Sequence, residues 1–242
     1  MRAPFHIFPL GDAAATIELG QQIDEQLNHQ VLAMQQWLQQ HRFQGLLDSV
    51  TGYCSLTVYY DPFIVHKNYA PAGTVFNWVR DRLQQAYTQA QPSAVENNNI
   101  IRIPVCYEAP FSPDLVNLAQ QARLSTAEVV TLHTNTIYNV YMNGFLPGFS
   151  YMGAVNPQIA VPRKSRPEPV AAGSVGIAGS QTGIYPLNSP GGWQIIGRTP
   201  LKIFDPFADE PVRLRAGNKV QFYPITVKEF GEWQSQSSNP AY

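Results

Sequence analysis

The sequence predicts an α+β protein, with a small N-terminal α/β sandwich followed by a C-terminal β-barrel. Residues 5–90 combine short strand patterns with two amphipathic helical patterns. A polar, aperiodic segment at 91–99 follows them and is typical of a domain junction. Beyond residue 137, strand-like runs are broken by Gly or Pro roughly every eight to twelve residues, which favours a barrel. The predicted boundaries are 1–95, 96–233 and a tail at 234–242.

The composition is that of a lightly charged globular protein. Of 242 residues, 44% are hydrophobic and 14% are charged, and the formal net charge is −1. This balance argues against electrostatic binding of nucleic acid, which needs a basic surface. No apolar run is long enough to span a bilayer, and the N-terminus lacks the apolar core of a signal peptide, so we expect a cytoplasmic protein. In that compartment, Cys54 and Cys106 are expected to be buried free thiols.

Local patterns define the elements expected in the N-terminal domain. Apolar residues at helical spacing, with glutamines on the outer face, predict a helix from Ile23 to Leu38. Alternating residues predict a strand that runs to Tyr60, where the Asp61-Pro62 pair ends it. The expected elements are strands at 5–10 and 14–19, helices at 23–38 and 74–90, and a strand within 46–60.

Helix-capping patterns and regular Gly and Pro breaks define the second domain. Residues 112–114, Ser-Pro-Asp, combine an N-cap with a proline at the first helical position. Ser125 and Glu128 match a capping box that opens a helix toward His133. The expected strands are 100–107, 136–142, 174–179, 183–187, 193–199, 201–206 and a strand-turn-strand segment at 212–225.

The stretch 143–198 concentrates glycine, proline and aromatic residues and carries few charges. Glycine gives the backbone freedom, proline fixes φ, and aromatic rings supply flat walls. Such a mixture suits tight turns around a concave surface better than it suits a helix. We therefore take this stretch as the candidate functional site.

Several common chemistries lack a supporting motif. The glycines of GSVGIAG (173–179) are not followed by Lys-Ser, Lys-Thr or a helix pattern, as a phosphate loop or dinucleotide site requires. The histidine spacing does not indicate a metal site, and there is no Cys-x-x-Cys. There is no Gly-x-Ser-x-Gly elbow, and the stretch has too few carboxylates for a glycosidase pair. We expect neither a metal nor a cofactor bound by this chain.

Charged and titratable candidates lie on both sides of the first glycine turns. His133 suits proton transfer or hydrogen bonding, but a histidine at a helix end also caps it, where a positive charge favours the dipole. Arg163, with Lys164 and Arg166 nearby, suits binding of a carboxylate or phosphate through paired donors. The same cluster is equally consistent with a solvated, charged loop.

Polar and aromatic side chains beside the later glycine turns complete the candidates. Gln181, Thr182, Tyr185 and Trp193 suit a small-molecule pocket in which amide and hydroxyl groups orient a ligand and rings form its walls. For Trp193, packing inside the barrel is an equally good interpretation.

Six motifs, in this order, resemble the KipI family, also called allophanate hydrolase subunit 1 or the B subunit of 5-oxoprolinase. They are GFLPGFSYMG (144–153), PR (162–163), AGSVGIAGSQTGIYP (172–186), SPGGWQIIGRTP (189–200), FDP (204–206) and RAGNKVQFYPI (215–225). His133 and Tyr141 also match the upstream His and Tyr of the family pattern. The resemblance covers residues 100–225, and the N-terminal arrangement is compatible with it.

The resemblance implies a cyclophilin-like barrel and a function in a complex. Family members pair with a KipA-like protein, the C subunit of 5-oxoprolinase. A third protein, the A subunit, completes an enzyme that opens 5-oxo-L-proline to L-glutamate with ATP as co-substrate. This chain is then one component of an amide hydrolase, of this or a related kind, and is inactive alone.

The same resemblance implies the site residues. His133 and Arg163 are the implied catalytic groups, and Gln181, Tyr185, Trp193 and Arg166 are implied to bind substrate. The alternative is a KipI-like binding protein that inhibits a sensor histidine kinase.

One segment departs from the family pattern. A second Pro-Arg usually follows the first, whereas PRKSRPEPVAAGS (162–174) is one residue shorter and places Arg166 in a different register. Ser150 also stands where proline or alanine is usual. Anion recognition, and with it the exact substrate, is therefore the feature on which this chain can differ from its relatives.

Overall fold

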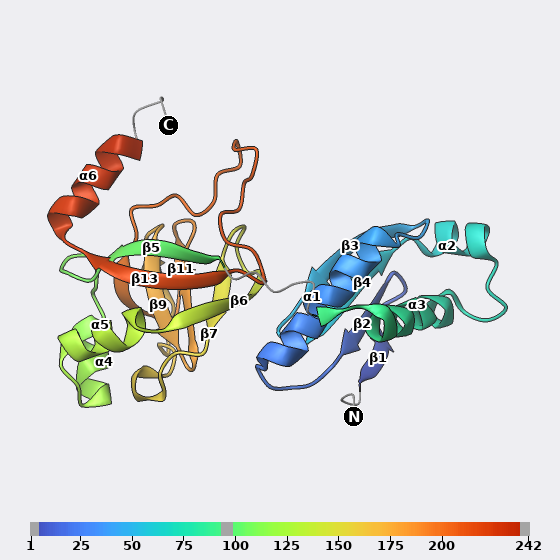
Figure 1. Ribbon diagram of the computed structural model, residues 1–242, viewed down its shortest axis with the longest axis horizontal. Coiled ribbons are helices and arrows are strands. Elements are labelled where there is room, and N and C mark those ends of the chain that lie inside the picture. Colours follow the sequence, from blue (N-terminus) through green and yellow to red (C-terminus); the bar gives the residue numbers. More distant parts are fainter. Residues whose placement is uncertain (1–4, 93–98, 238–242) are drawn as a thin grey trace. The chain divides into compact units, whose positions relative to one another are not determined.

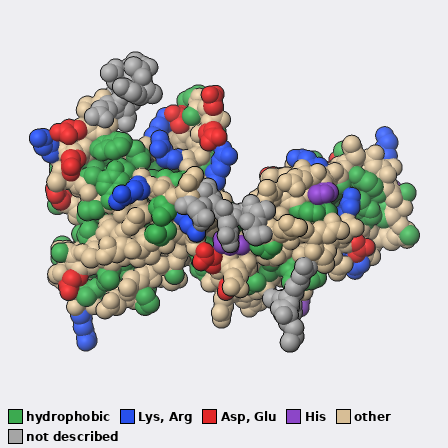
Figure 2. Space-filling view, in the orientation of Figure 1, with side chains coloured by type: hydrophobic (Ala, Val, Ile, Leu, Met, Phe, Trp, Pro, Cys, Tyr) green, Lys and Arg blue, Asp and Glu red, His purple; other side chains and the backbone are tan. Residues whose placement is uncertain are grey.

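The computed structural model describes residues 5–92 and 99–237, and it divides the chain into two compact units, 1–96 and 97–242 (Figure 1). The first unit is a sheet covered by helices, and the second is a closed β-barrel with helices beside it. The predicted α+β class is thereby confirmed. Acidic and basic side chains are interspersed over the face seen in Figure 2, as the small net charge leads one to expect.

The N-terminal unit is a two-layer sandwich. Its antiparallel sheet has the order β1-β2-β4-β3, and helices α1 and α3 pack against it and against each other. Alternate residues such as Ile17, Leu56 and Val58 are fully buried in its core. Its elements are β1 (His6–Pro9), β2 (Ala14–Glu18), α1 (Glu25–Gln40), β3 (Leu46–Thr51), β4 (Ser55–Tyr60), α2 (Pro62–Tyr69) and α3 (Val75–Gln89).

Two features of this unit differ from the prediction. The segment 46–60 forms a hairpin of two strands, closed by a bond from Gly52 N–H to the Ser55 carbonyl. Asp61 and Pro62 end the second strand as expected, but they also start helix α2. The Asp61 carboxylate accepts the N–H groups of residues 63 and 64, and proline fits the first turn of a helix.

The second unit is built on a seven-stranded closed barrel in the order β10-β7-β6-β13-β5-β12-β9. Strand β5 is the first strand of this unit and β13 is the last, and the two pair in parallel. A separate two-stranded sheet, β8 with β11, lies outside the barrel. The elements are β5 (Ile100–Cys106), α4 (Leu115–Ala122), α5 (Thr126–Thr134), β6 (Ile137–Asn143), β7 (Ser150–Gly153), the 3-10 helix η2 (Pro157–Ile159), β8 (Glu168–Val170), β9 (Ser174–Ala178), β10 (Gln181–Ile184), β11 (Ser189–Gly191), β12 (Gln194–Arg198), β13 (Lys219–Ile225) and α6 (Val227–Ser237).

Several sequence predictions for this unit are corrected. The expected strand at 201–206 and the first strand of the segment 212–225 are replaced by irregular backbone with one bridge, between Phe204 and Val212. Helix α4 begins at Leu115 with Asp114 at its N-cap, so Ser112 and Pro113 lie before the helix and not at the expected N-cap and first helical positions. Asp114 makes no capping bond; its carboxylate accepts the N–H of Ile195 and binds Lys164. The predicted tail is helical as far as residue 237, and its last residues, 238–242, lie outside the described part.

Other predictions for local features are confirmed. Ser125 and Glu128 form the expected capping box at the start of α5. Cys54 and Cys106 are buried free thiols. Within the described residues, no helix is both long and apolar enough to cross a membrane.

Candidate functional site

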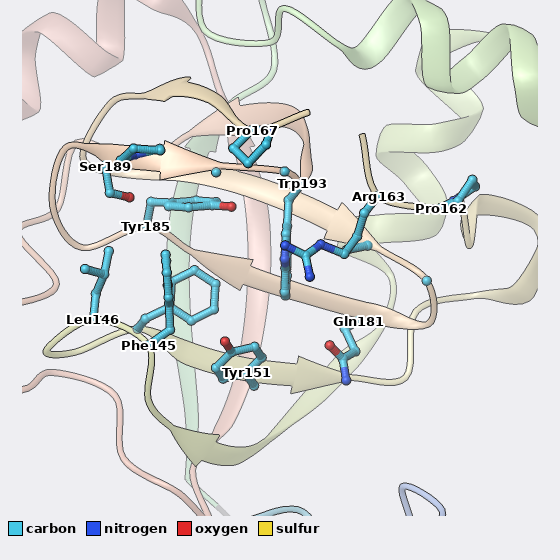
Figure 3. Close-up of a pocket in the computed structure, with 16 residues that line it drawn as sticks. Phe145, Leu146, Tyr151, Pro162, Arg163, Pro167, Gln181, Tyr185, Ser189 and Trp193 are labelled. Carbon is cyan, nitrogen blue, oxygen red and sulfur yellow. The ribbon is translucent and has the colours of Figure 1, made fainter. Parts of the chain in front are cut away.

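A pocket of about 760 Å³ opens on one wall of the barrel, and strands β7, β9, β10 and β11 contribute residues to it (Figure 3). Arg163 and Gln181 lie toward one end, and Phe145 and Leu146 lie toward the other. Its lining residues are Phe145, Leu146, Phe149, Tyr151, Pro162, Arg163, Pro167, Ala178, Gly179, Gln181, Tyr185, Ser189, Pro190, Gly191, Gly192 and Trp193. The stretch 143–198, taken as the candidate site, supplies every one of these residues.

Two glycines on neighbouring strands leave room for Trp193 in the wall of the pocket. Gly176 of β9 pairs with Gly183 of β10 in the barrel ladder. A Cβ on Gly183 would lie 3.1 Å from the Trp193 ring and 2.9 Å from the Ser150 carbonyl, and one on Gly176 would lie 3.0 Å from the Trp193 Cβ. Side chains at these two positions would therefore displace the indole.

An aromatic cluster forms the apolar part of the pocket. The Phe149 ring meets Tyr185 and Trp193 edge to face, with centroids 5.1 and 5.3 Å apart. Tyr151 lies 4.7 Å from Phe149 and 5.9 Å from Trp193, measured between centroids. Edge-to-face contacts are the favourable arrangement of aromatic quadrupoles, so these rings form a rigid wall.

Arg163 is the charged residue among those that line the pocket. Its guanidinium lies over Gly192, where a Cβ would come within 3.5 Å of it, and it forms no ion pair with a carboxylate in residues 5–92 and 99–237. The neighbouring Lys164 is different, because its ammonium is held by Asp114 at 2.7 Å and by Glu168 at 2.6 Å. The pocket thus presents a single uncompensated cation.

The two tyrosines of the pocket are hydrogen-bond donors at neutral pH. Burial raises the pKa of Tyr151 and of Tyr185, and the positive charge of Arg163 offsets part of that increase. Their hydroxyl groups stay protonated and lie within the electrostatic reach of Arg163. A guanidinium and neutral phenols together suit an anionic or strongly polar group of a ligand.

His133 does not line the pocket but supports the strand behind it. It is fully buried, and its ring stacks on Phe222. The Tyr107 hydroxyl lies 2.8 Å from Nδ1, and Nε2 lies 3.0 Å from Thr182 Oγ1, which donates its own proton to the Gly176 carbonyl. Since Thr182 has used its proton, Nε2–H is the donor to Thr182, and Nδ1 accepts from Tyr107.

This arrangement corrects one interpretation of His133. Burial lowers the pKa of His133 to about 3, so it carries no charge at neutral pH. It therefore does not stabilise the helix dipole as a cation. It is a hydrogen-bonding residue that ties helix α5 to strand β10.

The structure brings together most of the candidate residues. Arg163, Gln181, Tyr185 and Trp193 line one pocket, although the chain separates them into several loops and strands. Arg163 and Arg166 are both exposed, but Arg166 does not line the pocket.

Tyr151 is a pocket residue that the sequence does not single out, because an aromatic beside a Pro-Gly turn is more often core. Its register opposite Gly183 on β10 places it in the pocket.

Comparison with known proteins assigns the chain to a family. Residues 5–214 match the family described as carboxyltransferase domain, subdomain C and D. The chain belongs to this family. Among its relatives, the B subunit of 5-oxoprolinase from Bacillus subtilis is 42% identical over 98% of this chain and 100% of its own length. The corresponding protein of Haemophilus influenzae is 35% identical over 90% of this chain and 96% of its own length.

Solved structures of relatives agree with the fold. The crystal structure of TTHA0988 superimposes with a TM-score of 0.74 at 34% identity, over 88% of this chain. The matched region is 40% of that longer chain. That solved chain thus continues well beyond the part that this chain matches.

Proposed function

We propose that this chain is the B subunit of an ATP-dependent 5-oxoprolinase complex, which opens 5-oxo-L-proline to L-glutamate and in which the isolated chain is inactive. The relative of that name in Bacillus subtilis supports this, because the match runs over its whole length at 42% identity. The fused relatives support a role beside other chains. TTHA0988 and the Lachancea kluyveri urea amidolyase contain the matched region within longer polypeptides.

The observation that carries the proposal is the pocket with one cation at its polar end. 5-Oxoproline has a carboxylate, a lactam amide and an apolar ring edge. We assign the carboxylate, or a phosphorylated intermediate, to Arg163, whose guanidinium binds such groups through paired donors. Gln181 and Tyr185 are placed to orient the amide, and Trp193 to contact the ring.

His133 then acts as a positioning residue in the proposed reaction. It is buried behind β10, and a pKa of about 3 makes it a poor proton donor or acceptor near pH 7. Its bond to Thr182 holds the strand that carries Gln181. We assign ATP binding to another protein of the complex, because the glycine motif here forms strands β9 and β10 and not the start of a helix.

The test compares two arginines from the same loop. In a complex reconstituted with the A and C subunits, Arg163→Ala is expected to raise the KM for 5-oxoproline roughly 10- to 100-fold, the usual effect of losing a charge-assisted hydrogen bond. Arg166→Ala removes an exposed guanidinium outside the pocket and is expected to change KM by less than about twofold. Steady-state kinetics of ATP-dependent glutamate release measures both.

Equal kinetics for wild type and Arg163→Ala would overturn the assignment of the pocket. The alternative hypothesis, a binding protein that inhibits a sensor histidine kinase, predicts a different outcome. In that case the chain would bind a kinase and would not support glutamate release with the other two proteins of the complex.

A further inference from the structure

A hairpin between β12 and β13 projects from the barrel and is anchored firmly at its base (Figure 1). Ile203 and Leu214, at its two ends, are buried in the barrel core. Between them, Phe204 bridges to Val212, and Asp205 N–H donates to the Pro211 carbonyl at 2.8 Å. We call residues 203–214 the β12–β13 hairpin.

The base of this hairpin is bonded to the loop that carries the apolar end of the pocket. Asn143 Nδ2 donates to the Leu214 carbonyl at 2.9 Å, and Ala216 N–H donates to Asn143 Oδ1 at 3.2 Å. A Cβ on Gly148 would lie 2.9 Å from the Phe204 Cβ, so the two backbones approach closely. The base of the hairpin is therefore in direct contact with the loop at 144–149, which contributes to the pocket.

The tip of the hairpin presents one aromatic side chain in an ordered turn. Phe207 is 95% exposed, the highest value among the large hydrophobic residues described. Its N–H donates to Asp205 Oδ1 at 3.1 Å, and Lys202 binds the other oxygen of Asp205 at 2.8 Å. The Lys202 bond and the Phe207 N–H lower the pKa of Asp205, so the turn is held by an ionised carboxylate.

An ordered and exposed aromatic of this kind is typical of a residue that anchors a protein interface. A large apolar side chain held in a rigid turn loses little conformational freedom when it binds. Phenylalanine is enriched at the cores of interfaces, where single aromatic anchors dominate the affinity.

The charges around Phe207 define the partner. Asp209 and Glu210 follow it and are exposed. Glu210 lies 3.7 Å from the Arg215 guanidinium, whereas Asp209 forms no ion pair within the described residues. Figure 2 shows acidic side chains at the outer end of this projection and basic ones below them. A negatively charged tip disfavours an anionic lipid surface or nucleic acid, and it favours a basic rim on a protein.

We propose that the β12–β13 hairpin is a docking element, which inserts Phe207 into an apolar socket bordered by Lys or Arg on a second protein chain. The inference rests on the proposed function in one respect, because it takes the second chain to be the C subunit of the complex. The longer relatives support a protein partner for this unit, since further polypeptide accompanies the matched region in them.

The experiment uses titration calorimetry to measure the affinity of the purified chain for the C-subunit homologue that is encoded in the same genome as this chain. Phe207→Ala is expected to weaken binding at least about tenfold, as for a central aromatic anchor. Asp209→Lys is expected to weaken it and to reduce its dependence on salt. The matched control is Phe63→Ala, which removes an 85% exposed phenylalanine from helix α2 and should leave the affinity unchanged.

Two outcomes of the binding experiment would overturn the inference, and they are distinguishable. If wild type and Phe207→Ala bind this homologue equally well, the docking role fails while the proposed function stands. If wild type does not bind it, both fail.

Sedimentation of the chain alone checks self-association. Loss of a homodimer in Phe207→Ala would make a second copy of this chain the partner and would also overturn the inference. All variants change exposed side chains, so each is expected to unfold at the same midpoint temperature as wild type. Thermal unfolding measures this and checks that the variants are folded.

Discussion

His133 shows how burial alters a single side chain in this barrel. Its two ring nitrogens are both satisfied in the neutral form, by Tyr107 and by Thr182. Protonation of Nδ1 would place an N–H donor where the Tyr107 hydroxyl needs an acceptor. It would also place a positive charge in an apolar core. The residue is thus locked as one neutral tautomer.

This burial predicts a specific dependence of stability on pH. The pKa of His133 is about 3 in the folded chain against an ordinary value of 6.5, so below pH 6.5 the unfolded chain takes up a proton that the folded chain does not. The contribution of His133 to the free energy of unfolding is complete above that pH. It falls by up to about 1.4 kcal/mol per pH unit as pH decreases toward 3. Urea unfolding at pH 7 and pH 5 measures it.

The variants isolate this contribution from that of the carboxylates. His133→Asn is expected to be less stable at pH 7 but to lose about 1–2 kcal/mol less than wild type between pH 7 and pH 5. His66→Asn, which removes an exposed histidine of α2, should retain the wild-type slope. Identical slopes for wild type and His133→Asn would show that the imidazole is protonated in the folded chain.

At the scale of elements, the strand pair β9–β10 is built to carry an indole on its outer side. Gly176 and Gly183 face each other across the ladder, and Trp193 rests over both. The absence of side chains at these two positions therefore decides where the indole lies.

The loop that bears Arg163 is fixed by a neighbouring residue, since Lys164 joins Asp114, just before α4, and Glu168 of β8. Burial alone lowers the pKa of Lys164, but these bonds outweigh it and raise that pKa. The ion pair therefore persists at neutral pH.

Two glycine substitutions test how the Trp193 indole is packed. Gly183→Ala is expected to lower the free energy of unfolding by about 1–3 kcal/mol, because its Cβ would meet the Ser150 carbonyl at 2.9 Å and the Trp193 ring at 3.1 Å. Gly231→Ala in helix α6, where no atom lies within 4 Å of the added Cβ, should raise it by up to about 1 kcal/mol. Urea unfolding of both variants measures the difference, and a Gly183→Ala chain as stable as wild type would contradict the packing described.

At the scale of the whole molecule, each unit has its own hydrophobic core. Val31, Leu56 and Val79 belong to the core of the first unit. Ile103 and Val220 belong to the core of the second. A compact unit with its own core can fold alone, as domains of roughly this size commonly do.

We therefore predict that residues 1–96 form a stable domain when expressed separately. The fragment should unfold in one cooperative thermal transition and give well-dispersed amide resonances. The full-length chain supplies the reference spectrum for the same residues. A fragment that aggregates or lacks dispersed signals would show that the first unit needs the barrel in order to fold.

The local elements could be predicted because their signals are local. Helical spacing located α1 and α3, and Ser125 with Glu128 located the start of α5. The prediction of a strand at 201–206 was wrong, because strand-like residues there have no neighbouring strand to pair with over their length. Strands β8 and β11 are three residues each, too short for an alternating pattern to indicate them.

By itself, the sequence determined the fold class, the family and the stretch that forms the pocket, because periodicity, caps and glycine-rich motifs act over short distances. The tertiary structure decided which candidate has which role. Among three neighbouring cations, Arg163 lines the pocket, Lys164 is paired and Arg166 lies outside the pocket. One of the two carboxylates that hold Lys164 comes from Asp114, and one of the two partners of the His133 ring comes from β10. Such pairings depend on strand register and barrel closure, which bring together residues far apart in the chain.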